Sequence, residues 1–166
     1  MAELVVHYSL TGKSRPVAEW LATGLGAEIE EIVEERPRAF AFRGIFRSGF
    51  DSLFRRRPAI RPMNHREDIF DRVILVCPVW GGRMAGPART WLHCHARSTK
   101  TLGLALMSGD GLTPPDVVSE FRNVVGRSPK LLLVMSEYDF SNRVAERKVA
   151  DFVRSITIEA AKFPVN

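Results

Sequence analysis

Four continuous apolar runs constrain the fold of this 166-residue chain more than any other feature. A strand with one face in water alternates apolar and polar residues, whereas a strand covered on both faces is apolar throughout. Because these runs do not alternate, they predict the buried strands of a parallel α/β sheet with helices on both faces. The runs are residues 4–8, 73–77, 102–107 and 131–135.

Between the runs, apolar residues recur at helical spacing. The segments with this period are residues 17–25, 88–95, 117–125 and 145–160. Thr113-Pro114-Pro115 is a start signal for the third helix, and Ser141 or Asn142 is expected to open the last one. The more polar run 28–33 indicates an edge strand. We therefore expect a single domain over residues 1–166, with five strands and neither repeat nor linker.

The first apolar run leads directly into the polar turn Ser9-Leu10-Thr11-Gly12-Lys13-Ser14, which a helical segment follows. A strand, a turn of hydroxyls and glycine, and a helix form a phosphate-binding arrangement. The free N–H groups and the dipole at a helix N-terminus favour an anion, and Gly12 lets the backbone approach it. The ending Gly-Lys-Ser also occurs in P-loops for nucleoside triphosphates, but that motif needs a glycine where His7 stands.

The turn 9–14 resembles the first loop of the flavodoxin family, which reads hydroxyl-x-Thr-Gly-x-hydroxyl and wraps the phosphate of FMN. Lys13 departs from the family, because many members carry Asn there, although a lysine also reaches a phosphate. The resemblance covers nearly the whole chain. It implies a doubly wound, five-stranded parallel sheet in the order 2-1-3-4-5. Ligands of such folds bind beyond the carboxyl ends of the strands, where the strand order reverses.

The loops after the third and fourth strands are the other expected flavin contacts. Pro78-Val79-Trp80-Gly81-Gly82 resembles the second flavin-contacting loop of the family. Trp80 offers a flat face for stacking, and the two glycines let backbone amides approach the ring edge. The alternative is a tryptophan that caps the core. Ser108-Gly109-Asp110-Gly111 fits a third contact at the other side or the pyrimidine edge of the ring, or else a plain turn. Family members often carry an aromatic residue there, and its lack here leaves room for a substrate or partner.

Residues 36–66 form a basic insert that distinguishes this chain from small flavodoxins. The simplest interpretation is a second crossover helix whose apolar stripe packs on the sheet. That stripe consists of Phe42, Ile45, Phe46, Phe50, Leu53 and Phe54. The alternatives are an anionic partner or a membrane surface, whereas nucleic acid is disfavoured because no recognition motif accompanies the charge. The basic residues that would serve a partner are Arg43, Arg47, Arg55, Arg56 and Arg57.

These observations predict an FMN-binding, flavodoxin-like redox protein without a required catalytic side chain. It would transfer electrons to a redox partner protein or use NAD(P)H to reduce a quinone-like acceptor. The net charge of +5 slightly favours reduction, because positive charge eases formation of the anionic reduced flavin. The alternative function is a flavin-free binding or scaffold module that uses the basic face. A phosphoacceptor receiver domain shares the topology, but His7-Tyr8-Ser9 offers none of the acidic residues it needs.

Other features bear on location and on metals. No apolar run approaches the ~18 residues that span a bilayer, and a strand that begins by residue 4 leaves no room for a signal peptide. With only Cys77 and Cys94, we expect no disulfide framework, a cytoplasmic location and a Cys77 in the core. His93-Cys94-His95 predicts no metal site, because adjacent helical residues point about 100° apart.

Overall fold

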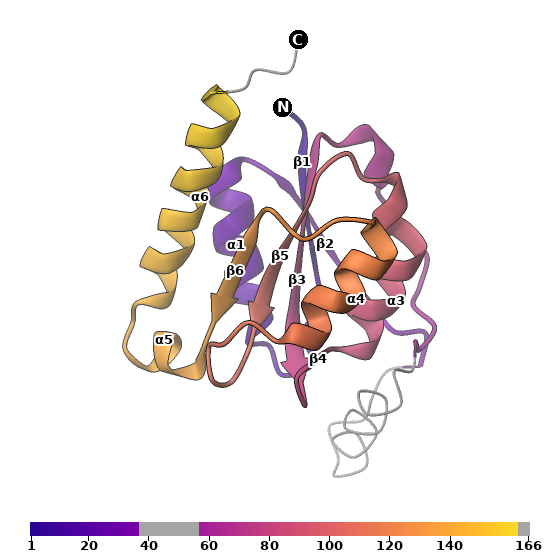
Figure 1. The fold of residues 1–166 in the computed structure, drawn as a ribbon, viewed down its shortest axis with the longest axis horizontal. Coiled ribbons are helices and arrows are strands. Elements are labelled where there is room, and N and C mark those ends of the chain that lie inside the picture. Colours follow the sequence, from indigo (N-terminus) through magenta and orange to yellow (C-terminus); the bar gives the residue numbers. More distant parts are fainter. Residues whose placement is uncertain (37–56, 163–166) are drawn as a thin grey trace.

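The computed structural model describes residues 1–36 and 57–162 of the chain, which form a sheet between two layers of helices (Figure 1). The described strands are β1 (Glu3–His7), β2 (Glu28–Glu31), β3 (Arg72–Trp80), β4 (Arg83–Met84), β5 (Leu102–Met107) and β6 (Leu132–Met135). The described α-helices are α1 (Ser14–Leu25), α3 (Gly86–His95), α4 (Pro115–Val125), α5 (Glu137–Ser141) and α6 (Ala145–Lys162).

Five of the described strands run parallel in the order β2-β1-β3-β5-β6. This is the predicted order 2-1-3-4-5, because the two-residue β4 lies off this path and pairs antiparallel with the end of β3. The predicted polar edge strand is confirmed as β2. The strand order reverses between β1 and β3, so the carboxyl ends of these two strands open the crevice at which doubly wound folds bind ligands.

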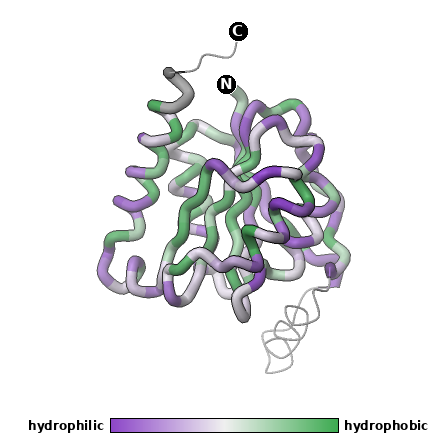
Figure 2. The backbone as a smooth tube through the Cα atoms, viewed as in Figure 1, coloured by the Kyte–Doolittle hydropathy of each residue, from purple (hydrophilic) through white to green (hydrophobic). Residues whose placement is uncertain are grey.

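Two apolar cores cover the two faces of the sheet. Helices α3 and α4 pack on one face, and α1 and α6 pack on the other. Along β1, Leu4 and Val6 point to the first core and Val5 to the second, so both faces of the strand are covered. This explains why the apolar runs are continuous (Figure 2). Cys77 is fully buried in the first core, as predicted, and burial raises the pKa of its thiol to about 12.

A two-residue hairpin connects β3 to β4. Val79 pairs with Met84 and Trp80 with Arg83, which leaves Gly81 and Gly82 alone in the turn. Both glycines have positive φ angles, 56° and 74°, as a type I′ hairpin turn requires at its two central positions. The conformation of the turn alone therefore accounts for both glycines, independently of any ligand that they contact.

The last helical region differs from the prediction, which opened one helix at Ser141 or Asn142. A capping box between Ser136 and Asp139 starts the separate helix α5, and α6 begins only at Ala145. Arg143, with a positive φ of 56°, interrupts the helical path between them. The predicted helix is thus confirmed as α6, which begins a few residues later than predicted, and α5 precedes it as an additional short helix.

The chain between β2 and β3 leaves the sheet and returns to it at adjacent points. Glu34 and Ile60 form an antiparallel bridge, and the N–H of Arg61 donates to the carbonyl of Val33 at 2.8 Å. The predicted apolar stripe from Phe42 to Phe54 and its arginines lie outside the described residues, except Arg57, which is exposed. The residues outside are Phe42, Ile45, Phe46, Phe50, Leu53, Phe54, Arg43, Arg47, Arg55 and Arg56.

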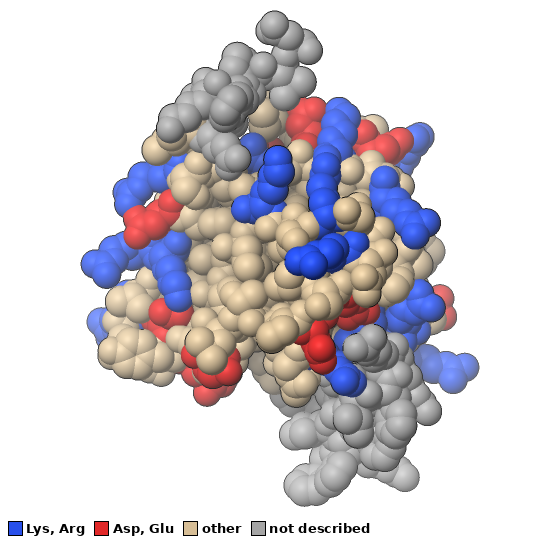
Figure 3. All heavy atoms as spheres, in the orientation of Figure 1, with Lys and Arg blue, Asp and Glu red and all other residues tan. Residues whose placement is uncertain are grey.

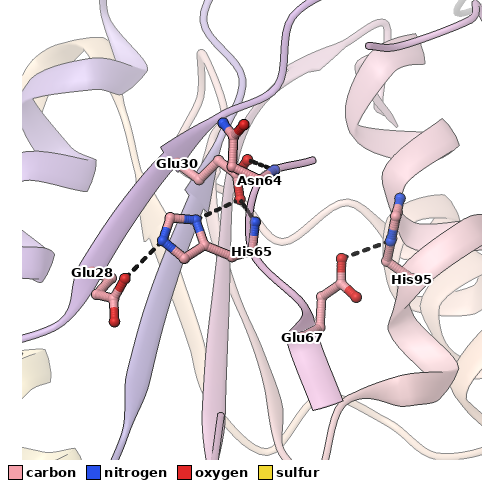
Figure 4. A network of polar contacts seen from close by, with 6 residues as sticks. All are labelled: Glu28, Glu30, Asn64, His65, Glu67 and His95. Atoms are coloured by element: carbon pink, nitrogen blue, oxygen red, sulfur yellow. Dashed lines mark hydrogen bonds and ion pairs between the residues drawn. The ribbon is translucent and has the colours of Figure 1, made fainter. Parts of the chain in front are cut away.

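Two histidine–carboxylate contacts fasten the returning segment (Figure 4). The ring of His65 lies between two carboxylates of the edge strand β2, with Nε2 at 2.7 Å from Glu28 and Nδ1 at 2.8 Å from Glu30. On the other side, Nδ1 of His95 in α3 lies 2.6 Å from Glu67. The segment is therefore held between the edge of the sheet and a helix of the first core.

Candidate functional site

The three predicted loops meet at a cavity of about 630 Å³ at the carboxyl edge of the sheet. A second cavity, of about 530 Å³, adjoins it and shares Val79, Ser108 and Gly109 with it. The predicted residues that line the first cavity are Leu10, Thr11, Lys13, Ser14, Pro78, Val79, Trp80, Ser108 and Gly109. Gly81, Gly82 and Asp110 line only the second, and Ser9, Gly12 and Gly111 line neither.

The turn 9–14 presents backbone donors at the start of α1. In the part of the chain that the structure describes, the N–H groups of residues 10–13 donate to no acceptor. Gly12 has a φ of 84°, and no atom lies within 4 Å of the position that a Cβ would take. Ser9 shapes this turn, because its Oγ accepts the N–H of Ser14 at 3.2 Å. Open space beside unpaired donors at a helix N-terminus is the chemistry of an anion cradle.

Trp80 forms part of the cavity wall and rests against Tyr8. The two rings meet edge to face, with centroids 6.0 Å apart and planes at 77°. The hydroxyl of Tyr8 donates to Oε1 of the buried Glu34 at 2.7 Å. Tyr8 therefore supports the tryptophan from the end of β1. Sequence reasoning missed this support because Tyr8 falls within an apolar strand run.

The loop 108–111 is a structured turn with an ionised carboxylate. Oδ1 of Asp110 accepts the hydroxyl of Ser108 at 2.6 Å and the N–H of Leu112 at 3.0 Å. These two hydrogen bonds, the one from Ser108 first, hold the pKa of Asp110 below its usual value. The N–H of Gly111 closes the turn on the carbonyl of Ser108 at 3.2 Å. The second cavity thus has a negative charge at its wall.

The wall on the side of α5 was not predicted. It places Glu137 opposite the turn 9–14, where Nζ of Lys13 donates to Oε1 of Glu137 at 2.5 Å. Both side chains are largely exposed at the rim, and the ammonium of Lys13 lowers the pKa of Glu137. The sequence signal that could have found this wall is Ser136-x-x-Asp139, the spacing of a capping box. The missed lining residues of the two cavities are Met107, Met135, Ser136, Glu137, Phe140, Ser141, Leu112, Thr113, Pro114 and Pro115.

The two histidines of His93-Cys94-His95 contact different partners. Nε2 of His93 lies 3.2 Å from Glu120 of α4, whereas His95 contacts Glu67. Over residues 1–36 and 57–162, no group of three or more metal-ligating side chains is placed to hold an ion. No helix in this described part is long and apolar enough to cross a membrane.

No protein-family model matches the sequence, and no curated protein is significantly similar to it. Solved structures do match. A protein from Bacteroides eggerthii DSM 20697, assigned as a flavoprotein, superposes with a TM-score of 0.74 at 19% identity, over 94% of this chain and 98% of the other. A flavoprotein from Lactobacillus acidophilus NCFM in complex with FMN gives 0.67 at 18% identity, over 85% and 97%. Flavodoxin 2 from Bacillus cereus gives 0.56 at 14% identity, over 98% and 100%. The strand order and these superpositions together show that the chain has a flavodoxin-like fold.

Proposed function

We propose that this protein binds FMN and works as a redox protein. The observation that carries the proposal is the turn 9–14, whose unpaired N–H groups and open Gly12 lie where the strand order reverses. Thr11, Gly12, Lys13 and Ser14 would hold the phosphate. Two adjoining cavities, with Trp80 at the wall of the first, offer space for the rest of the molecule. The FMN complex of the Lactobacillus acidophilus flavoprotein supports this assignment by similarity of fold.

The residues present fit each part of such a ligand. Backbone N–H groups and an ammonium suit a phosphate, and a large aromatic wall suits a flat apolar ring. When bound, FMN supplies the one- and two-electron chemistry, while the protein binds it, orients it and sets the charge around it. In the narrower form of the proposal, the protein transfers electrons or uses NAD(P)H to reduce a quinone-like acceptor. The net charge of +5 supports the second activity, because positive charge stabilises an anionic reduced flavin.

The experiment is a titration of the purified protein with FMN, followed by flavin fluorescence, for the parent and for Gly12→Val. We expect this substitution to weaken binding by roughly 10- to 100-fold, because a side chain there separates the phosphate from its backbone donors. Gly26→Val is the matched control. Gly26 also has a positive φ, 64°, and open space around it, but it ends α1 and lies away from both cavities.

The control separates loss of the site from backbone strain. If Gly26→Val weakens FMN binding as much as Gly12→Val does, the phosphate is not at residues 9–14. A parent protein that binds no FMN would favour the second candidate function, a flavin-free scaffold module. Anaerobic titration of the FMN-loaded protein with NADPH, and then with a quinone, tests the narrower proposal. If NADPH does not bleach the flavin, NAD(P)H-dependent reduction is ruled out and electron transfer between proteins is the remaining activity.

A further inference from the structure

An ion pair between Lys13 and Glu137 joins the starts of two helices across the rim of the first cavity. Lys13 immediately precedes α1, and Glu137 is the first residue of α5. Their side chains meet at 2.5 Å, and both line the cavity. The pair therefore stands beside the unpaired N–H groups at which the proposed function places a phosphate.

Hydrogen bonds within α5 and from α6 hold the start of the helix that carries Glu137. Ser136 and Asp139 exchange hydrogen bonds in the capping box of α5, and the N–H of Ser136 donates to the Asp139 carboxylate at 2.7 Å. Nζ of Lys148 in α6 also donates to this nearly buried carboxylate at 2.9 Å. Because the start of α5 is held in this way, the backbone that carries Glu137 is fixed beside the turn 9–14.

A phosphate at the turn 9–14 meets two effects of Glu137. The carboxylate occupies the ammonium of Lys13, which would otherwise donate to the phosphate. It also adds a negative charge beside a dianion, which is unfavourable even at a screened surface. Both effects act on the phosphate alone and leave the contacts of a neutral ring unchanged.

We propose that Glu137 is a specificity-determining residue that lowers the affinity of the turn 9–14 for phosphate by competing for Lys13. This inference rests on the proposed function and deepens it. Free phosphate, which gains nothing from the aromatic wall, is then bound poorly, so the ring contacts decide which phosphate ester occupies the site.

The experiment compares FMN with riboflavin, which has the same ring and no phosphate, in titrations of the parent and of Glu137→Gln. We expect Glu137→Gln to raise the affinity for FMN roughly two- to fivefold, the scale of an exposed ion pair, and to leave riboflavin unchanged. In a Lys13→Gln background the gain should shrink. Glu146→Gln, in the first turn of α6 and outside both cavities, removes the same charge and should change neither ligand.

Two outcomes overturn the inference: an FMN affinity that Glu137→Gln leaves unchanged or lowers, and equal shifts for FMN and riboflavin. Failure of the proposed function looks different, because the parent protein would then bind no FMN. In that event, inorganic phosphate replaces FMN as the probe, with the amide resonances of the turn 9–14 followed by NMR. Tighter phosphate binding by Glu137→Gln than by the parent supports the inference, and equal binding refutes it.

Discussion

His65 faces a carboxylate at each of its two ring nitrogens, and a neutral imidazole has only one N–H to donate. Only the protonated ring satisfies both Glu28 and Glu30. The hydrogen bond to Glu30 is the largest cause that raises the pKa of His65 above its ordinary 6.5, and the bond to Glu28 adds to it. The contact that fastens the returning segment to β2 is therefore at full strength only while His65 is charged.

We expect the difference in unfolding free energy between the parent and His65→Gln to depend on pH. Because the pKa is raised in the folded state, the stabilisation is complete below about pH 6.5 and is lost as the pH rises through the folded value. Urea unfolding at pH 6.0 and pH 9.0 measures it. The parent should lead by up to about 1 kcal/mol at pH 6.0 and by less at pH 9.0.

The pH dependence of stability that His7 causes has the opposite sign, and it cancels in the comparison of the parent with His65→Gln. Burial lowers the pKa of His7, so its effect costs stability as the pH falls below 6.5. Both proteins contain His7, and its contribution cancels in their difference. An equal lead of the parent at the two pH values would contradict the assignment to His65.

At the scale of the element, strand β5 passes so close to its neighbours that one position has no room for a side chain. A Cβ on Gly103 would lie 2.7 Å from Cδ1 of Ile74 in β3 and 2.9 Å from Cβ of Leu131, just before β6. Gly103→Ala should therefore destabilise the protein by about 1–3 kcal/mol in urea unfolding, the cost of overpacking a core. Ile74→Val removes the nearer obstructing atom and should recover part of the loss in the double variant. Additive effects of the two substitutions would show that Ile74 is not the obstacle.

Element length decides how much of this fold could be predicted. The runs around Val5, Val76 and Ala105 are long enough to show that they are covered on both faces, so they predicted the parallel sheet, whereas its strand order came from the resemblance to the flavodoxin family. Strand β4 has two residues and α5 has five, and no period can be read from so few positions. Three loops of the candidate site were predicted because their glycines, their hydroxyl residues and Trp80 match the residue types of the flavin-contacting loops in the flavodoxin family. Glu137 was not, because its position depends on where α5 begins.

At the scale of the whole molecule, basic residues outnumber acidic ones, 24 to 19. Lys and Arg side chains are spread over the face in Figure 3 and interspersed with acidic groups. The net charge of +5 creates a long-range field that steers anions more than it stabilises the fold. We propose that the run Arg55-Arg56-Arg57 serves an anionic partner or cofactor such as NADPH.

Changing Arg55, Arg56 and Arg57 to Gln should alter the unfolding free energy by less than about 1 kcal/mol per residue. At low salt it should slow NADPH oxidation with a quinone acceptor, and the difference from the parent should vanish as salt screens the field. The matched control changes three exposed arginines elsewhere, Arg122, Arg127 and Arg147. If both triple variants slow the reaction equally, the net charge matters and the run has no special role.

The paired ends of the excursion between β2 and β3 have an evolutionary consequence. Because Arg61 donates its N–H to the carbonyl of Val33 and Glu35 donates to that of Ala59, the two ends of the excursion are fastened directly to each other. The entropy cost of closing a chain segment between two fixed ends grows slowly with its length, by about 0.6 kcal/mol per doubling. We therefore expect a change in the number of residues between these ends to cost the fold little in closure entropy. Selection can thus change the number of residues in this stretch at the edge of the sheet that carries the cavity, since Glu34 accepts the hydroxyl of the Tyr8 that supports Trp80.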